Sequence, residues 1–248
     1  MSYRSKLLIK KFLSKTIGKL IKPKGNRILM YHSLGTRVKN DIYEIYSLDI
    51  NLFKIHLEYL HNNCNDRLSS LKDFTLVPNS ICITFDDGFK DVFYKASPIL
   101  SDLSIPFTVF VPPKMIIEKN NDYLSIPELR ELSQIKNCTI GAHGYSHEPL
   151  ASLSIREIRE EISKSKNCLE DILGEEIDLM SYPHGSLNDI VKKTVKECGF
   201  KSASSSQPGT NSTNIDMYEL KRTSILSHDY LKDFCSKING EWDWTKWI

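Results

Sequence analysis

Two neighbouring carboxylates, Asp86 and Asp87, come directly after a short apolar segment and directly before Gly88. The segment, residues 80–85, alternates large apolar residues with smaller ones, which predicts a buried strand. Carboxylates at the mouth of a buried strand are costly to desolvate unless a cation or a hydrogen-bond network holds them. Asp-Gly is also a common turn pair, so the two acids alone leave a simple turn open.

Two histidines, His143 and His147, follow another predicted strand at residues 138–142. Four-residue spacing on a turn or irregular helix lets both imidazole rings converge on one ion. With a carboxylate from the first segment, they would form a two-histidine, one-carboxylate metal site with positions left for water. Five of the seven histidines follow predicted strands: His32, His143, His147, His184 and His228. The other two, His56 and His61, fall on a helical pattern, where a packing or surface role is expected.

Strand and helix patterns alternate along the chain and would position these groups. Seven apolar segments predict strands, at residues 27–32, 80–85, 105–111, 138–142, 177–182, 200–204 and 220–226. Helical patterns separate them, and Pro98 is expected to kink or end one of these helices. Strands that alternate with helices imply parallel pairing through right-handed crossovers, and hence a barrel or a doubly wound sheet.

The composition is that of a globular protein whose charge is unevenly distributed. Hydrophobic residues make up 40% and charged residues 26% of the 248 positions, which excludes a disordered chain. The net charge is +2, yet residues 1–40 hold eleven Lys or Arg and no acidic residue. The remainder carries 22 basic against 31 acidic residues, a net of −9. An acidic body argues against nucleic acid as a partner, while the basic segment favours an anionic surface.

Residues 6–22 show the pattern of a basic amphipathic helix that ends at Pro23. Its apolar face would hold Ile9, Phe12, Leu13, Ile17, Leu20 and Ile21, opposite Lys11, Lys15, Lys19 and Lys22. Such a helix either lies in an anionic membrane interface or packs on the body with its lysines in solvent. Its apolar runs are too short for a secretion signal or a membrane span.

The six cysteines are scattered and form no Cys-x-x-Cys pair. Several fall in apolar contexts, where a free cysteine behaves as a small hydrophobic residue. This favours a reducing compartment, although an even number leaves three disulfides formally open. Together with the lack of a secretion signal, the cysteines predict a cytoplasmic protein, peripheral at the inner face of the membrane if the N-terminal helix binds lipid.

Three segments stand in a familiar order: Thr84-Phe-Asp-Asp-Gly88, His143-Gly-Tyr-Ser-His147 and Ser181-Tyr-Pro-His-Gly185. With them, the sequence resembles the NodB-homology polysaccharide deacetylases, carbohydrate esterase family four. The first two match that family's first two motifs. The third is similar to the Tyr-Pro-Tyr-Gly form of the branch that deacetylates exopolysaccharide N-acetylglucosamine, as is Leu29-Met-Tyr-His32. The resemblance covers roughly residues 27–235.

The resemblance implies one divalent metal ion, expected to be zinc, held by Asp87, His143 and His147. Asp86 would then be the general base that accepts a proton from the attacking water. Arg222 is expected to pair with Asp86 and lower its pKa, unless it forms only a surface salt bridge.

In the third motif, the residue after Pro183 donates its backbone N–H to the oxyanion, and here that residue is His184 instead of the usual tyrosine. Tyr182, Pro183 and His32 are expected to contact the substrate. Ile225-Leu-Ser-His228 is a looser match to the fifth motif, whose histidine protonates the departing amine. A strand-end histidine without that role is the alternative, and the fourth motif, Asp-x-x-Asp-Trp, is absent.

The resemblance therefore implies an α/β protein with a distorted (β/α) barrel of about seven parallel strands. Residues 26–248 would form the catalytic domain, behind the N-terminal helix at residues 1–25. The implied activity is metal-dependent removal of an N-acetyl group from an acetamido sugar, in a surface glycan or its lipid- or nucleotide-linked precursor. An O-deacetylase with the same site, a catalytically silent carbohydrate-binding relative and a membrane-associated assembly factor are the alternatives.

Overall fold

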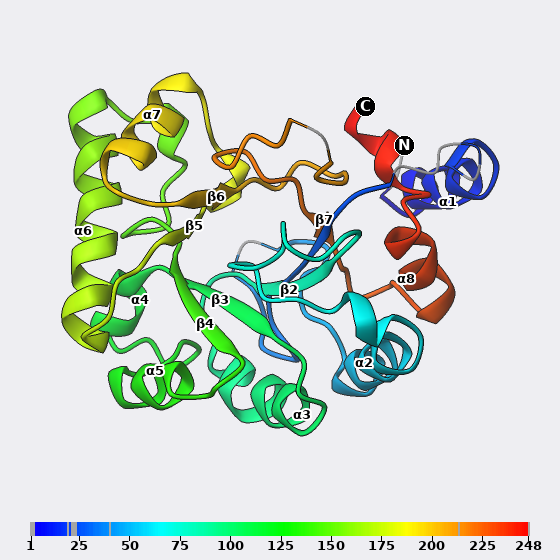
Figure 1. Cartoon of the computed structure of the whole chain (residues 1–248), viewed down its shortest axis with the longest axis horizontal. Helices are drawn as coiled ribbons and strands as arrows, with labels where there is room; N and C mark the ends of the chain where they lie inside the picture. Colours follow the sequence, from blue (N-terminus) through cyan, green and yellow to red (C-terminus); the bar gives the residue numbers. More distant parts are fainter. Residues whose placement is uncertain (1–2, 19, 21–23, 40, 213, 248) are drawn as a thin grey trace.

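Seven parallel strands form one curled sheet in the order β6-β5-β4-β3-β2-β1-β7. The computed structural model describes residues 3–18, 20, 24–39, 41–212 and 214–247. The strands are β1 Arg27–Tyr31, β2 Ile81–Phe85, β3 Phe107–Val111, β4 Cys138–Ala142, β5 Leu179–Ser181, β6 Ser202–Ser204 and β7 Thr223–Ser224. Each predicted strand is present, and the curled sheet surrounded by helices confirms the distorted (β/α) barrel (Figure 1).

Helices connect the strands and begin where the sequence supplies capping residues. Asp49 accepts hydrogen bonds from the first turn of one helix, and Ser154 belongs to a capping box at the start of another. The helix does not end at Pro98: a π-helical turn, Val92–Ala96, runs directly into the helix Ser97–Asp102, so the helix type changes just before the proline. The helices are α1 Tyr3–Leu13, α2 Ile50–Cys64, α3 Ser97–Asp102, α4 Pro113–Ile117, α5 Ile126–Ser133, α6 Ile155–Leu173, α7 Asp189–Glu197 and α8 Leu231–Ile238.

The strands turn alternate side chains towards the helices and towards the inside of the curled sheet. On β2, Ile83 and Phe85 belong to the main core between sheet and helices, whereas Cys82 belongs to a second apolar cluster. Side chains of a strand repeat every two residues, so Asp86 continues the series of Cys82. The alternation therefore directs a carboxylate into the hollow of the sheet.

Phe110 and Arg222 fill the inside of the sheet. The guanidinium carbon of Arg222 lies 5.6 Å from the centroid of the Phe110 ring, and both side chains are almost fully buried. Gly141 on β4 makes room for this ring, because a Cβ atom at that position would lie 2.6 Å from Phe110 Cδ1. The interior is thus packed around a cation, which must find acceptors there.

The N-terminal helix packs against the C-terminal segment (Figure 1). α1 begins at Tyr3 and is extended by a π-helical turn, Ser14–Gly18, while the predicted end at Pro23 lies outside the described residues. The Trp244 indole N–H donates to Ser14 Oγ over 3.0 Å. The last turn of the chain therefore anchors the helix to the body.

The sides of α1 differ from the predicted division into an apolar and a lysine face. Leu8, Ile9 and Phe12 are 68%, 47% and 67% exposed. Lys11 faces the body instead, with its Nζ 2.6 Å from Asp233 Oδ2 on α8. The prediction of a solvated face is therefore wrong for Lys11, because this ion pair turns it inward. Among the described residues, no helix has the length and apolar content needed to cross a bilayer.

Candidate active site

Residues that follow four of the strands meet in one pocket of about 440 Å³. His32 follows β1, Asp86 and Asp87 follow β2, His143 follows β4, and His184 lies in the turn after β5. Parallel strands bring their carboxyl ends to one edge of a sheet, where the following loops converge. Positions 32, 86 and 143, far apart in the sequence, are therefore neighbours in the fold.

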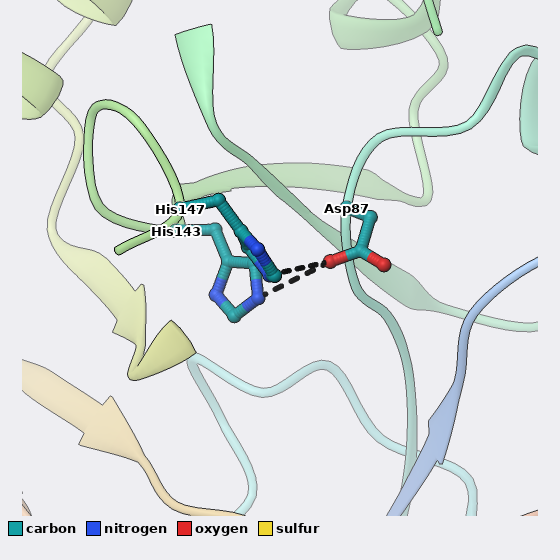
Figure 2. Close-up of side chains that lie close together, drawn as sticks. All are labelled: Asp87, His143 and His147. Carbon is teal, nitrogen blue, oxygen red and sulfur yellow. Dashed lines mark ion pairs between the residues drawn. The ribbon is translucent and has the colours of Figure 1, made fainter. Parts of the chain in front are cut away.

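Asp87, His143 and His147 form a compact cluster at the base of this pocket. Asp87 Oδ1 lies 3.0 Å from His147 Nε2 and 3.4 Å from His143 Nε2. Figure 2 shows both rings, carried by the loop after β4, directed at the carboxylate that follows β2. The three donor atoms all lie within 4.8 Å of one another, which suits ligands of a single ion.

The hydrogen bonds of His143 leave the correct nitrogen available for an ion. His143 Nδ1 lies 2.9 Å from the Ser181 backbone oxygen, which can only accept, so Nδ1 carries the proton. Nε2 then has a free lone pair directed at the Asp87 oxygen, and two such atoms repel unless a cation or a proton lies between them. Metal-ligating histidines commonly donate their other N–H in this way. The donor set therefore fits a divalent metal ion.

Glu161 on α6 holds the loop that carries both histidines. Its Oε2 accepts from the backbone N–H groups of Tyr145 (3.0 Å) and Ser146 (2.9 Å), and its Oε1 accepts from Ser146 Oγ (2.7 Å). These three bonds fix the turn between His143 and His147. Sequence reasoning missed Glu161, because a glutamate in a long charged helix resembles any solvent-facing residue.

The backbone at the cluster is held in an unfavourable conformation. Asp87, His147 and His184 have φ angles of 72°, 66° and 57°. Left-handed backbone costs a residue other than glycine about 1–2 kcal/mol. Such strain persists only where surrounding contacts impose it, and it often marks a functional site.

Asp86 is paired with Arg222 in the interior, as the family resemblance implied, and not in a surface salt bridge. Arg222 Nη1 lies 2.6 Å from Asp86 Oδ1, and Nη2 lies 2.7 Å from Oδ2, which makes a bidentate ion pair. The Arg222 and Asp86 side chains are 1% and 4% exposed. Arg222 also donates to the Ser181 hydroxyl and the Ser205 backbone oxygen. Burial disfavours the carboxylate charge, but the guanidinium outweighs it and lowers the pKa of Asp86. Asp86 is therefore an ionised carboxylate beside the cluster of Asp87, His143 and His147. Neither Asp86 nor Arg222 belongs to that cluster.

Comparison with known proteins identifies the family. A model of the family described as polysaccharide deacetylase matches residues 75–203, more than half of the chain. The chain belongs to the polysaccharide deacetylase family.

Individual relatives share much of this chain's length. YxkH of Bacillus subtilis is 28% identical over 214 residues, covering 82% of this chain and 72% of that protein. A Staphylococcus aureus protein named poly-beta-1,6-N-acetyl-D-glucosamine N-deacetylase is 24% identical over 233 residues, covering 87% and 78%.

Solved structures share the fold of this deacetylase-family chain. The Streptococcus pyogenes deacetylase PplD, in complex with acetate, superposes with a TM-score of 0.78 at 20% identity, covering 88% of this chain and 99% of PplD. IcaB from Ammonifex degensii gives 0.74 at 20% identity, covering 88% and 98%.

The segment resembling the family's third motif forms a tight turn at the rim of the pocket. His184 has a positive φ, and its ring centroid lies 4.6 Å from that of His147. Tyr182 lines the pocket, but its hydroxyl donates to the Tyr218 backbone oxygen over 2.8 Å. Pro183 is buried and packs beside Gly144, so it does not line the pocket. Tyr182 is 1% exposed and belongs to the main core, so His184 and Gly185 are the residues of this motif that remain for a substrate.

His32 and His228 lie in different places. His32 lines the pocket of the cluster, where its ring centroid is 4.5 Å from that of Tyr46 and its buried Nδ1 has no partner in the described part of the chain. Burial lowers the pKa of His32. His228 lines another cavity, beside α1, and its backbone oxygen accepts from Lys11 Nζ. A strand-end position thus brings His32 to the site but not His228, because the turn to Asp229 directs the latter towards the N-terminal helix.

We expect Glu161→Gln to weaken metal binding about 10–100-fold, the usual cost of removing a group that orients ligands. The neutral amide accepts fewer and weaker hydrogen bonds from the loop. Competition with a chromophoric chelator measures the affinity. Glu160→Gln is the matched control, because Glu160 on the same helix is exposed and pairs with Arg156. Equal affinities in the wild-type protein and Glu161→Gln would contradict this role.

Proposed function

We propose that the protein removes the acetyl group from the nitrogen of an acetamido sugar, in a surface glycan or in its lipid- or nucleotide-linked precursor, with the help of a divalent metal ion. The observation that carries this proposal is an Arg222-paired carboxylate, Asp86, beside the Asp87, His143 and His147 cluster in one pocket. The Staphylococcus aureus relative named as an N-deacetylase supports the nitrogen linkage.

Asp87, His143 and His147 would hold the ion, which we propose to be zinc. When bound, it would polarise the acetamide carbonyl and lower the pKa of a nearby water towards about 7. Asp86, outside the ligand set, takes the proton from the attacking water. Arg222 keeps Asp86 ionised and fixes its orientation.

The His184 backbone N–H is the proposed donor to the oxyanion of the tetrahedral intermediate. This N–H has no hydrogen-bond acceptor in the part of the chain that the structure describes, and it lies at the rim of the same pocket. A backbone donor survives the exchange of the usual tyrosine for histidine. Loss of one such donor typically costs about 10²–10³ in rate.

His32, rather than His228, is the proposed acid that protonates the departing amine. It shares the pocket with Asp86 and Asp87, and its Nδ1 has no partner among the described residues. Because burial lowers the pKa of His32, the ring is neutral at rest and must take up the proton that Asp86 accepts from water before it passes a proton to the amine. His228 lines the neighbouring cavity instead. The acid must reach the leaving nitrogen directly or through one water, which favours the residue inside the pocket.

Asp87→Asn should lose both metal and activity, because an amide is a poorer ligand and the site has only three protein donors. Asp86→Asn should keep the metal and lose about 10²–10⁴ in rate for want of a proton acceptor. Metal content and acetate release from N-acetylated sugars, measured on both variants side by side, test the division of roles. Parental turnover in Asp86→Asn would place the base elsewhere, and metal loss in Asp86→Asn alone would swap the two residues.

On a simple acetamido sugar, His32→Gln should lower kcat by a factor at least ten times larger than His228→Gln does. Both variants should keep their metal. General acid catalysis typically contributes about 10²–10⁴ in rate, and glutamine cannot supply the proton. A larger loss in His228→Gln would restore that residue as the acid.

We also propose that residues 1–25 form a basic arm that contacts an anionic membrane surface, such as the inner face of the cell membrane, while residues 26–248 form the catalytic body. Two observations support the arm: its lysine-rich sequence and the exposed apolar side chains of Leu8, Ile9 and Phe12.

The double exchange of Ile9 and Phe12 to Gln should weaken binding to vesicles of anionic lipid at least tenfold, because two exposed apolar groups lose their burial in the interface. Co-sedimentation at low salt measures it. Ile155→Gln on α6, 63% exposed, is the control for loss of an exposed isoleucine elsewhere. A wild-type protein that ignores such vesicles would refute the arm's role.

A further inference from the structure

A second cavity, of about 340 Å³, adjoins the active-site pocket. Ser206 and Ser224 line both, so the two spaces share a wall. Leu7 and Lys10 of α1 line this cavity together with Trp242 from the C-terminal segment. The cavity therefore lies between the Asp86 pocket and α1.

The lining of this cavity is apolar with an unbalanced positive charge. Leu7, Leu226 and Trp242 supply apolar surface. Lys10 forms no ion pair within the described ranges, and the buried Nε2 of His228 likewise has no partner there. Such a site favours an anion attached to an apolar group and disfavours a sugar amine, which is cationic at neutral pH.

The one acid among the described residues of the lining does not cancel this charge. Asp243 is held by Arg27, with Oδ1 and Oδ2 2.9 and 3.0 Å from the two guanidinium nitrogens. Lys237, the other lysine of the lining, pairs with Asp229. The ammonium of Lys10 therefore remains for a ligand.

We propose that this cavity binds the phosphate on the anomeric carbon of the acetamido sugar and the first part of an attached lipid chain. The inference rests on the proposed deacetylation, since the sugar ring would occupy the Asp86 pocket. The anomeric carbon is next to the carbon that bears the acetamido group, so a phosphate there emerges beside the reacting amide. Leu7, Leu226 and Trp242 in the lining give the first part of a lipid chain apolar contacts inside the cavity. These contacts favour a lipid over a nucleotide, whose ribose and base are polar.

Three N-acetylglucosamine substrates that differ in the group on the anomeric carbon separate the contributions of the phosphate and of the lipid to turnover. They carry a short-chain prenyl diphosphate, a uridine diphosphate and a methyl group. Acetate release gives kcat/KM for each with the wild-type protein, Lys10→Gln and Lys232→Gln. Lys232 is exposed on α8 and does not line this cavity, which makes it the matched control. Calorimetry with the prenyl diphosphate sugar measures binding independently of turnover.

We expect kcat/KM to be at least tenfold higher for the prenyl substrate than for the methyl glycoside. Lys10→Gln should lower that ratio about tenfold, which corresponds to the loss of one charged hydrogen bond. Lys232→Gln should keep the ratio. Equal rates for all substrates, preference for the uridine compound or an unchanged ratio in Lys10→Gln would overturn the inference. If no substrate releases acetate, the proposed deacetylation fails. In that case Lys10-dependent binding of the prenyl sugar would still support the cavity, and its absence would overturn it.

Discussion

The buried pair of Asp86 and Arg222 is the interaction on which this structure depends. A guanidinium inside a curled sheet would be very costly without acceptors, and Asp86 supplies two of them at 2.6 and 2.7 Å. The hydroxyls of Thr84 and Ser181 and the Ser205 backbone oxygen accept from the other three N–H groups, so Arg222 ties β2 to β5 and to the segment after β6. In return, Asp86 stays ionised in a hollow that would otherwise favour its neutral form.

The rest of the site is built outward from that pair, and a hydrogen bond to the Ser181 backbone oxygen leaves the Nε2 lone pair of His143 free. Ser181 contacts both the Asp86–Arg222 pair and the histidine cluster. Its hydroxyl accepts from Arg222, and its backbone oxygen fixes the tautomer of His143. Glu161 orders the turn between His143 and His147 from the outer helix layer. The two neighbouring carboxylates thereby acquire different surroundings, Asp86 among donors and Asp87 facing two imidazoles, which is the physical basis for giving them different roles.

Sequence patterns predicted what depends on local periodicity and on pairing at strand ends. All seven strands are present, and all six cysteines are free, as their scatter favoured. The Asp86–Arg222 contact, which the family resemblance implied, is also present. The predictions that failed concern the direction in which side chains point in the tertiary structure. Strand-end position alone could not separate His32 from His228, since a turn decides which cavity a side chain enters. Helical periodicity likewise could not foresee that Asp233 turns Lys11 inward, and the positive φ of Asp87 has no local signature in the sequence.

The central claim is that Asp87, His143 and His147 hold one divalent ion beside the Asp86 carboxylate. X-ray absorption spectroscopy on the purified protein, combined with elemental analysis, tests it most directly. The account predicts about one ion per chain with two imidazole nitrogens at about 2.0–2.1 Å, and loss of both the ion and that signature in His143→Ala. Stoichiometric metal that lacks histidine ligands, or that survives His143→Ala unchanged, would contradict it.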